Sequence, residues 1–160
     1  MLRTPQDVKR QEISQINERF LGETITRLEP LSICTSESLN DDFTATDFSF
    51  QITGPDNKII SIEGAKGKGF VDGLFGGLKN NFSDKYQSLE KIKLVDINVN
   101  PIMSQSKIKM RTDAQASVVF VLEVGKRGLA EFQHQSRSMI YSCFVATLNA
   151  FEFYINCERC

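Results

Sequence analysis

Three stretches of the chain place apolar residues at the spacing of a half-buried helix. The first covers residues 5–21 and opens with Thr4-Pro5, a cap residue followed by proline. The second covers residues 70–82, and the third covers residues 140–155. Apolar side chains recur every three or four residues at Val8, Ile13, Ile16 and Phe20, at Phe70, Val71, Leu74, Phe75, Leu78 and Phe82, and at Ile140, Phe144, Leu148, Phe151 and Ile155. The pattern predicts three amphipathic helices.

Between these helices the apolar residues alternate with polar ones or cluster in short runs, as they do in strands. Two turn sequences, Gly54-Pro55-Asp56-Asn57 and Gly125-Lys126-Arg127-Gly128, each separate two such stretches and predict hairpins. The pattern predicts six strands, over residues 23–35, 48–52, 60–62, 91–102, 116–124 and 129–135.

The order of these elements repeats. After the first helix, the sequence strand-strand-strand-helix occurs twice, over about residues 23–85 and 90–157. One such unit has a single sheet face and a single covering helix, so two units must pack together to complete a core. We therefore expect a two-layer α+β domain over residues 23–160 with pseudo-twofold symmetry, preceded by a linker helix over residues 1–22. Incomplete layering also favours a homodimer.

The composition narrows the possible functions. Apolar residues make up 41% of the 160 residues, charged residues 24%, and the net charge is −1. A scattered, balanced charge does not favour nucleic-acid binding, and no apolar run approaches the roughly 20 residues of a membrane span. We expect a cytoplasmic protein without a signal peptide. Of four cysteines only Cys157 and Cys160 are close, and we expect reduced thiols, with Cys143 on a buried helix face, rather than a metal site.

The glycines at 67, 69 and 73 are the first candidate for ligand chemistry. Glycines between a strand and a helix can hold an anion at the helix N-terminus. Their spacing is not that of the dinucleotide-binding fingerprint, and no Lys-Ser or Lys-Thr follows to make a phosphate loop. The alternative is that these glycines only permit a tight turn.

Two further polar segments could contact a ligand. Residues 111–116 are polar and then small at the entry to a strand, which would allow close approach of a ligand, or would form a turn closed by Asp113. Ser136 or Ser138 is expected to cap the last helix, with Arg137 between them as a surface charge or a ligand contact. The single histidine, His134, lies in a predicted strand, and no catalytic triad or paired carboxylates are recognisable.

These segments, in this order, resemble the C-terminal regulatory domain of the α-isopropylmalate synthase family, which includes citramalate and homocitrate synthases. The likeness spans about residues 25–155. It rests on Gly67-x-Gly69-x-Val71-Asp72, similar to the family's G-x-G-P-x-D-A segment, on Thr112-Asp113-Ala114-Gln115-Ala116, similar to its T-D-A-Q-A strand entry, and on Asn149-Ala150, which falls where its last helix carries A-Y-x-N-A.

The resemblance implies a domain that binds the end product of a pathway, usually leucine or isoleucine, near a dimer interface. Binding there feedback-inhibits an acetyl-CoA-dependent catalytic barrel. The barrel's D-G-x-Q strand and H-x-H metal pair have no counterpart here, so we expect no enzyme activity, cofactor or metal for this chain alone. The expected effector-binding residues are Gly67, Gly69, Asp72, Leu94, Ile97, Thr112, Asp113, Ala114, Arg137 and Ser138.

An amino-acid ligand also suits these residue types physically. Backbone N–H groups at the glycine turn or at the start of the last helix can bind a carboxylate, and Asp72 can bind an ammonium group. Three positions depart from the family pattern: Phe70 replaces proline, Gly73 replaces alanine and Ser138 replaces aspartate. These departures leave two alternatives open, a dimerisation module that has lost its effector and an unrelated nucleotide-binding domain.

Overall fold

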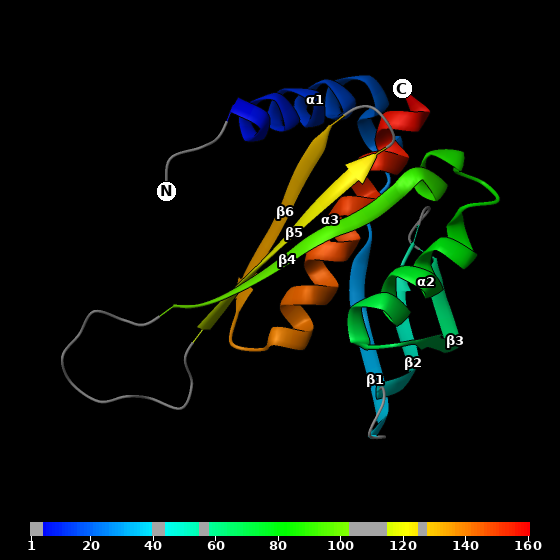
Figure 1. Cartoon of the computed structure of the whole chain (residues 1–160). Coiled ribbons are helices and arrows are strands. Elements are labelled where there is room, and N and C mark those ends of the chain that lie inside the picture. Colours follow the sequence, from blue (N-terminus) through cyan, green and yellow to red (C-terminus); the bar gives the residue numbers. More distant parts are fainter. Residues whose placement is uncertain (1–4, 40–43, 55–57, 103–114, 125–127) are drawn as a thin grey trace.

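A computed structural model of the chain describes residues 5–39, 44–54, 58–102, 115–124 and 128–160 (Figure 1). The elements in chain order are α1 (Pro5–Leu21), the 3₁₀ helix η1 (Gly22–Thr24), β1 (Glu29–Leu39), β2 (Thr44–Thr53), β3 (Ile59–Gly67), α2 (Phe70–Phe82), the 3₁₀ helix η3 (Gln87–Lys91), β4 (Ile92–Ile102), β5 (Gln115–Val124), β6 (Leu129–Ser136) and α3 (Met139–Arg159).

The predicted α+β fold with two strand-strand-strand-helix units is confirmed. The first three strands form one antiparallel sheet in the order β1-β2-β3, and the last three form a second in the order β4-β5-β6. Each sheet is followed by its helix, α2 or α3, and α1 precedes both units (Figure 1). The three helices lie where the apolar spacing predicted them.

The two units match in detail as well as in order. The first strand of each unit has a register shift at the corresponding place, between Pro30 and Ser32 in β1 and between Leu94 and Asp96 in β4. The middle strands carry a buried phenylalanine each, Phe50 and Phe120. A bulge bends and twists a strand locally, so β1 and β4 are bent at the corresponding place, although among the described residues only the first sheet has a further register shift, between Phe48 and Ser49 in β2.

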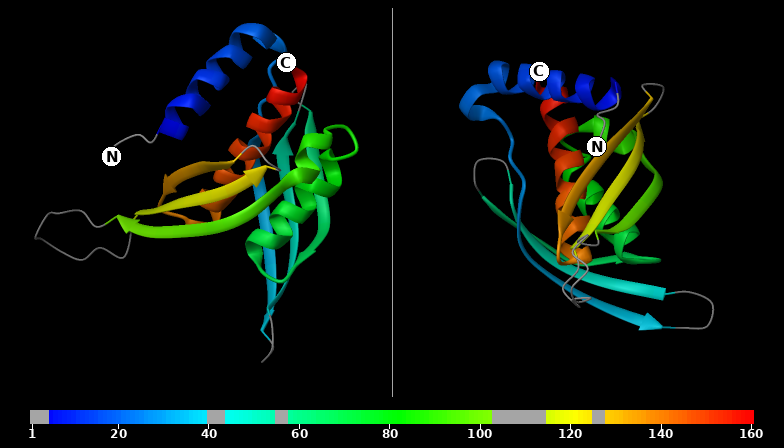
Figure 2. Two further views of the ribbon diagram at one scale, coloured as in Figure 1. Left: turned by 45° about the horizontal axis from the view of Figure 1, so that its top comes forward. Right: turned by 90° about the vertical axis from the view of Figure 1, so that its left-hand side faces the viewer.

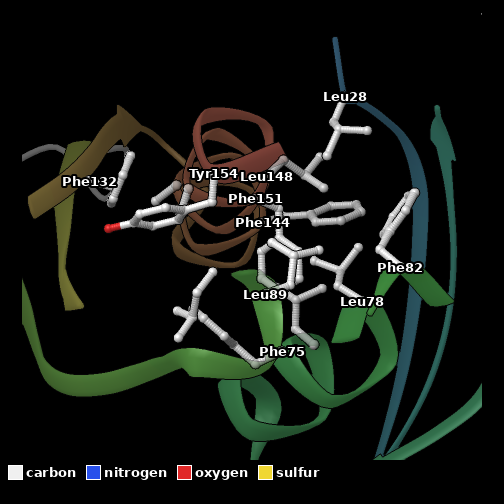
Figure 3. Packing of buried hydrophobic residues seen from close by; sticks show 14 of the residues in the cluster. Leu28, Phe75, Leu78, Phe82, Leu89, Phe132, Phe144, Leu148, Phe151 and Tyr154 are labelled. Atoms are coloured by element: carbon white, nitrogen blue, oxygen red, sulfur yellow. The ribbon is translucent and has the colours of Figure 1, made fainter. Parts of the chain in front are cut away.

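One hydrophobic core joins the two units. The sheets lie on opposite sides of it, and side chains from α2 and α3 meet between them, with Leu28 at one edge and Phe132 at the other (Figure 3). The core is rich in aromatic rings, and its buried phenylalanine and tyrosine residues are Phe50, Phe75, Phe82, Tyr86, Phe120, Phe132, Phe144, Phe151 and Tyr154. Burial of such side chains contributes most of the stability of a domain this size.

The first strand begins later than the sequence predicted. Residues 23–35 were expected to form it, but β1 runs from Glu29 to Leu39, and residues 25–28 are extended without a strand partner. Side chains of α3 bind this extended segment instead: Asn156 accepts from the N–H of Thr26 and donates to its carbonyl, both at 2.9 Å, and Glu152 accepts from the N–H of Leu28 at 3.0 Å. These three hydrogen bonds hold residues 25–28 against the side of α3.

The helices at the two ends of the chain also differ from the predicted pattern in their exposed residues. Ile140, predicted in the buried stripe of α3, is exposed in its first turn, while Phe144, Leu148, Phe151 and Ile155 are buried as expected. The helix α1 lies across the C-terminal end of α3 (Figures 1 and 2). Within the described ranges, none of the helices has the length and hydrophobicity needed to cross a lipid bilayer.

Candidate functional site

The N-terminal ends of α2 and α3 lie next to each other, at the end of the helical pair that is opposite to α1 (Figures 1 and 2). Four of the predicted site residues belong to the start of α2 or the turn before it, or cap α3: Gly67, Gly69, Asp72 and Ser138. The first turns of two helices present unpaired backbone N–H groups and the positive ends of two helix dipoles. Two such ends at one place favour a bound anion.

The turn before α2 is compact at Gly67. A Cβ atom at this position would lie 2.2 Å from the backbone nitrogen of Gly73, so only glycine lets the end of β3 pack against the helix. Gly69 is different, because its φ of 176° is ordinary extended backbone and a Cβ there would meet no atom within 4 Å. Its carbonyl accepts from the N–H of Gly73 at 3.1 Å. Gly67 is thus needed for packing, whereas Gly69 leaves open space above the helix end.

Asp72 is exposed in the first turn of α2, and its carboxylate already accepts a hydrogen bond from the turn that precedes the helix. Its Oδ2 accepts a hydrogen bond from the backbone N–H of Lys68 at 3.1 Å. The carboxylate therefore closes the loop that precedes the helix, and it also opposes the positive end of the helix dipole. The second oxygen is on an exposed side chain, where it can face a ligand.

Ser138, one of the two cap residues that the sequence predicted, caps α3. Its Oγ accepts from the N–H of Tyr141 at 3.2 Å, and its own N–H donates to Oγ of Ser136 at 3.1 Å. Oγ of Ser136 also lies 2.7 Å from Oγ of Ser142, which is fully buried. Arg137 is exposed between the two serines. The start of α3 is therefore fixed by a set of short hydroxyl contacts.

His134 is the residue at this site that sequence reasoning missed. Its Nδ1 lies 3.4 Å from Oγ of Ser142, and its ring stands edge-on to the ring of Tyr141 with the centroids 5.4 Å apart. Burial lowers the pKa of the imidazole, so it is neutral at physiological pH. The alternation of β6 places His134 on the same face as buried Phe132. This alternation is the sequence signal that could have indicated an inward-facing histidine.

The inner face of β4 provides an apolar surface at the same end of the molecule. Residues directly opposite each other in an antiparallel sheet share a face, and Val99 pairs with buried Val118, which in turn pairs with His134. Ile97 pairs with buried Phe120 and so also faces inward. Nevertheless Ile97 and Val99 are 37% and 43% exposed, while Leu94 is half-buried.

The two units differ in how far the inner face of their first strand is covered. Ile33 pairs with Phe50 as Ile97 pairs with Phe120, and it is half-buried in a strand on which α3 packs. Ile97 in the second unit remains exposed. The pseudo-twofold arrangement thus leaves an apolar strip, formed by Ile97 and Val99, open on β4. Val99 lies two strands from His134, about 10 Å at the usual spacing of strands, and the ring of His134 contacts Tyr141 in the first turn of α3.

Not every predicted site residue can be placed. Thr112, Asp113 and Ala114 lie outside the described residues. No family model matches the chain, and no curated protein matches it. The family resemblance thus rests on the motifs quoted above and on the order of the elements.

Proposed function

We propose that this chain is an amino-acid-sensing regulatory domain of the α-isopropylmalate synthase type. Leucine, or else isoleucine, is the effector, and its binding inhibits an acetyl-CoA-dependent catalytic barrel in the same or a partner chain. The observations that support this most are the neighbouring N-termini of α2 and α3 (Figures 1 and 2) and the exposure of Ile97 and Val99 on the inner face of β4. A branched-chain amino acid needs this pair of surfaces, one for its carboxylate and one for its alkyl group.

Each part of the ligand has a matching group. The carboxylate binds the backbone N–H groups at the start of α2 or of α3, where the helix dipoles favour negative charge. The ammonium group pairs with the outer oxygen of Asp72, whose other oxygen holds the turn. The alkyl group packs on Ile97 and Val99, which are otherwise left in water.

A second function, a dimerisation module without an effector, is favoured by one specific observation. The Asp72 carboxylate accepts a hydrogen bond from Lys68, so it has a structural role that needs no ligand. In this alternative two copies pair through the exposed apolar residues of β4, and the start of α3 is merely capped by the hydroxyl of Ser138.

Calorimetric titration with leucine, isoleucine, valine and lysine tests the proposal. We expect leucine or isoleucine to bind and lysine not to bind. In Asp72→Asn the amide oxygen keeps the hydrogen bond from Lys68 but loses the charge, so affinity falls by roughly 10-fold or more while the melting temperature changes little. Asp84→Asn, on an exposed aspartate after α2, is the control and leaves affinity unchanged.

Two results would contradict the proposal. If none of the four amino acids binds the wild-type protein, the chain has no such effector and the dimerisation module becomes the better description. If leucine or isoleucine binds Asp72→Asn and Asp72→Ala as tightly as the wild type, Asp72 is not part of the site, and its role is confined to the turn before α2.

A further inference from the structure

The helix α1 is docked with its polar side toward the domain. Ile16 and Phe20 are 60% and 71% exposed, whereas Asn17 is 5% exposed. Arg10, Ser14, Asn17 and Glu18 follow one another at helical spacing and share the side of α1 that faces the rest of the protein. A helix that packs only for stability would turn its apolar side inward. This orientation points to a polar role for the inward side.

The inward side of α1 forms one wall of a pocket of about 210 Å³. The other walls are the extended segment at Ile25 and Arg27, the β6 residues Phe132 and Gln133, and the side of α3 that carries Asn149 and Glu152. This space is enough for a molecule of the size of a free amino acid.

One end of the pocket carries a surplus of negative charge. Arg27 lies between two carboxylates, with one guanidinium nitrogen 2.9 Å from Oε1 of Glu18 and another 2.9 Å from Oε1 of Glu152. The hydrogen bonds that Arg27 donates to Glu18 and Glu152 raise the pKa of its guanidinium, which is therefore charged at neutral pH. Two carboxylates against one guanidinium leave this cluster one unit negative.

The other end carries a positive charge. The guanidinium of Arg10 lies 4.8 Å from the centre of the Phe132 ring, a cation–π contact that positions the side chain against the wall made by β6. Arg10 and Glu18 are two turns apart on α1, about 12 Å along the helix axis. The pocket is thus neutral in total but has opposite charges at its two ends.

Uncharged polar groups line the space between these ends. Ser14 and Asn17 contribute a hydroxyl and an amide from α1, and Gln133 and Asn149 contribute amides from β6 and α3. Asn17 is positioned by α3, because its Nδ2 donates to Sγ of Cys157 at 3.3 Å. Such a lining suits a ligand with hydrogen-bonding groups along its length, and disfavours the purely aliphatic side chain of leucine.

We propose that this pocket binds a small zwitterion, a free amino acid with a polar side chain, with its carboxylate toward Arg10 and its ammonium group toward Glu18 and Glu152. The pocket shares no residue with the site at the starts of α2 and α3, so this binding goes beyond the function proposed above and can be tested independently of it. Because α1 forms one wall and α3 another, the bound ligand holds α1 against the domain.

Titration calorimetry with L-glutamine, L-asparagine, L-threonine and L-serine tests the proposal on the whole chain. Succinate and putrescine serve as probes that carry only negative or only positive charge. We expect at least one of the amino acids to bind, and to bind more tightly than either of these two. Ser14→Leu fills the pocket from α1 and lowers that affinity by about 10-fold or more, and Arg10→Gln lowers it similarly. Gln15→Leu, at the exposed neighbouring position of α1, leaves it unchanged.

A second readout follows α1 itself. At a ligand concentration near the wild-type dissociation constant, the ligand slows hydrogen exchange of the α1 amides in the wild type and in Gln15→Leu, and has a much smaller effect in Ser14→Leu. The proposal is overturned if none of the four amino acids binds at millimolar concentration, if succinate or putrescine binds more tightly than all of them, or if Ser14→Leu binds as tightly as Gln15→Leu. The response to leucine or isoleucine decides only the function proposed above.

Discussion

The ring of Phe75, on the helix of the first unit, lies 5.9 Å from the ring of Phe120, on the middle strand of the second unit. The converse pair is also present, since Phe50 of the first sheet lies 5.3 Å from Phe144 of the second helix, in a similar edge-on geometry. Phe75 and Phe144 each stand five residues after the first residue of their helix. Each unit therefore completes its core with a residue of the other.

This exchange predicts that the two units unfold together. Replacing Phe75 by alanine removes a buried ring that contacts both Phe120 and Phe151, and we expect it to lower the free energy of unfolding by about 3–5 kcal/mol. Urea denaturation followed by circular dichroism measures this loss. Phe20→Ala is the control, since that ring is exposed on α1 and its removal should change stability by no more than about 0.5 kcal/mol.

The number of steps in the unfolding transition also tests whether the two units unfold together. Wild type and Phe75→Ala should both unfold in a single step, because neither unit has a complete core alone. Two separated transitions, or a variant in which only half of the helical signal is lost, would show that the units are independent.

The turn before α2 gives a prediction from two neighbouring glycines. Gly67→Ala forces a Cβ atom against the backbone of Gly73, which cannot move without shifting the start of the helix, so we expect a loss of about 1–3 kcal/mol. Gly69→Ala has open space and an extended backbone, and should change stability by no more than about 0.5 kcal/mol. Thermal unfolding of both variants checks this, and an equal effect would mean that the turn adapts to a side chain at either position.

The sequence predicted the helices and most strands because their signals are local. Spacing of three and four residues placed α2, and the alternation of Phe50 and Ile52 with polar neighbours placed β2. The start of β1 could not be read in the same way. Residues 25–28 have the composition of a strand, but α3 binds them through Asn156 and Glu152, which are more than 120 residues away in the chain.

The candidate site was predicted only in part, because some of its features have local sequence signals and others depend on contacts between distant segments. The glycine turn and the cap at Ser138 have local sequence signals, and both were found in place. Their proximity, and the exposure of Ile97, depend on how the two units pack, which no local pattern encodes. Likewise the apolar spacing in α1 gave its length but not its orientation, because Asn17 rather than Ile16 faces the domain.

We also predict a homodimer, because β4 exposes several large apolar side chains: Val95, Ile97, Val99 and Ile102. A monomer would leave them in water, at a cost of about 25 cal/mol per Å² of apolar surface. Val95→Asp should therefore raise the dissociation constant of the dimer, whereas Asn100→Asp adds the same charge on β4 at an exposed polar position and should have a smaller effect. Light scattering across a dilution series measures both, and a wild-type monomer at micromolar concentration would refute the prediction.

The buried thiol of Cys143 makes stability depend on pH in the alkaline range. Burial raises the pKa of this thiol from 9.0 to about 11, because the thiolate is disfavoured in the core. Its neutral form contributes fully below pH 9.0, and the contribution is lost as pH rises toward 11, since the unfolded chain then releases a proton that the folded chain retains. The slope from this group is at most about 1.4 kcal/mol per pH unit.

A comparison of variants isolates this contribution from the other groups that titrate above pH 9. Urea unfolding from pH 8 to 10.5 should show stability falling more steeply in the wild type than in Cys143→Ala, which has no thiol to ionise at this position. Cys34→Ala, at an exposed cysteine, should retain the wild-type slope. If Cys143→Ala loses stability with pH as steeply as the wild type, then the thiol ionises as readily in the folded protein as in the unfolded chain, and Cys143 is not shielded from water by α3 and its neighbours.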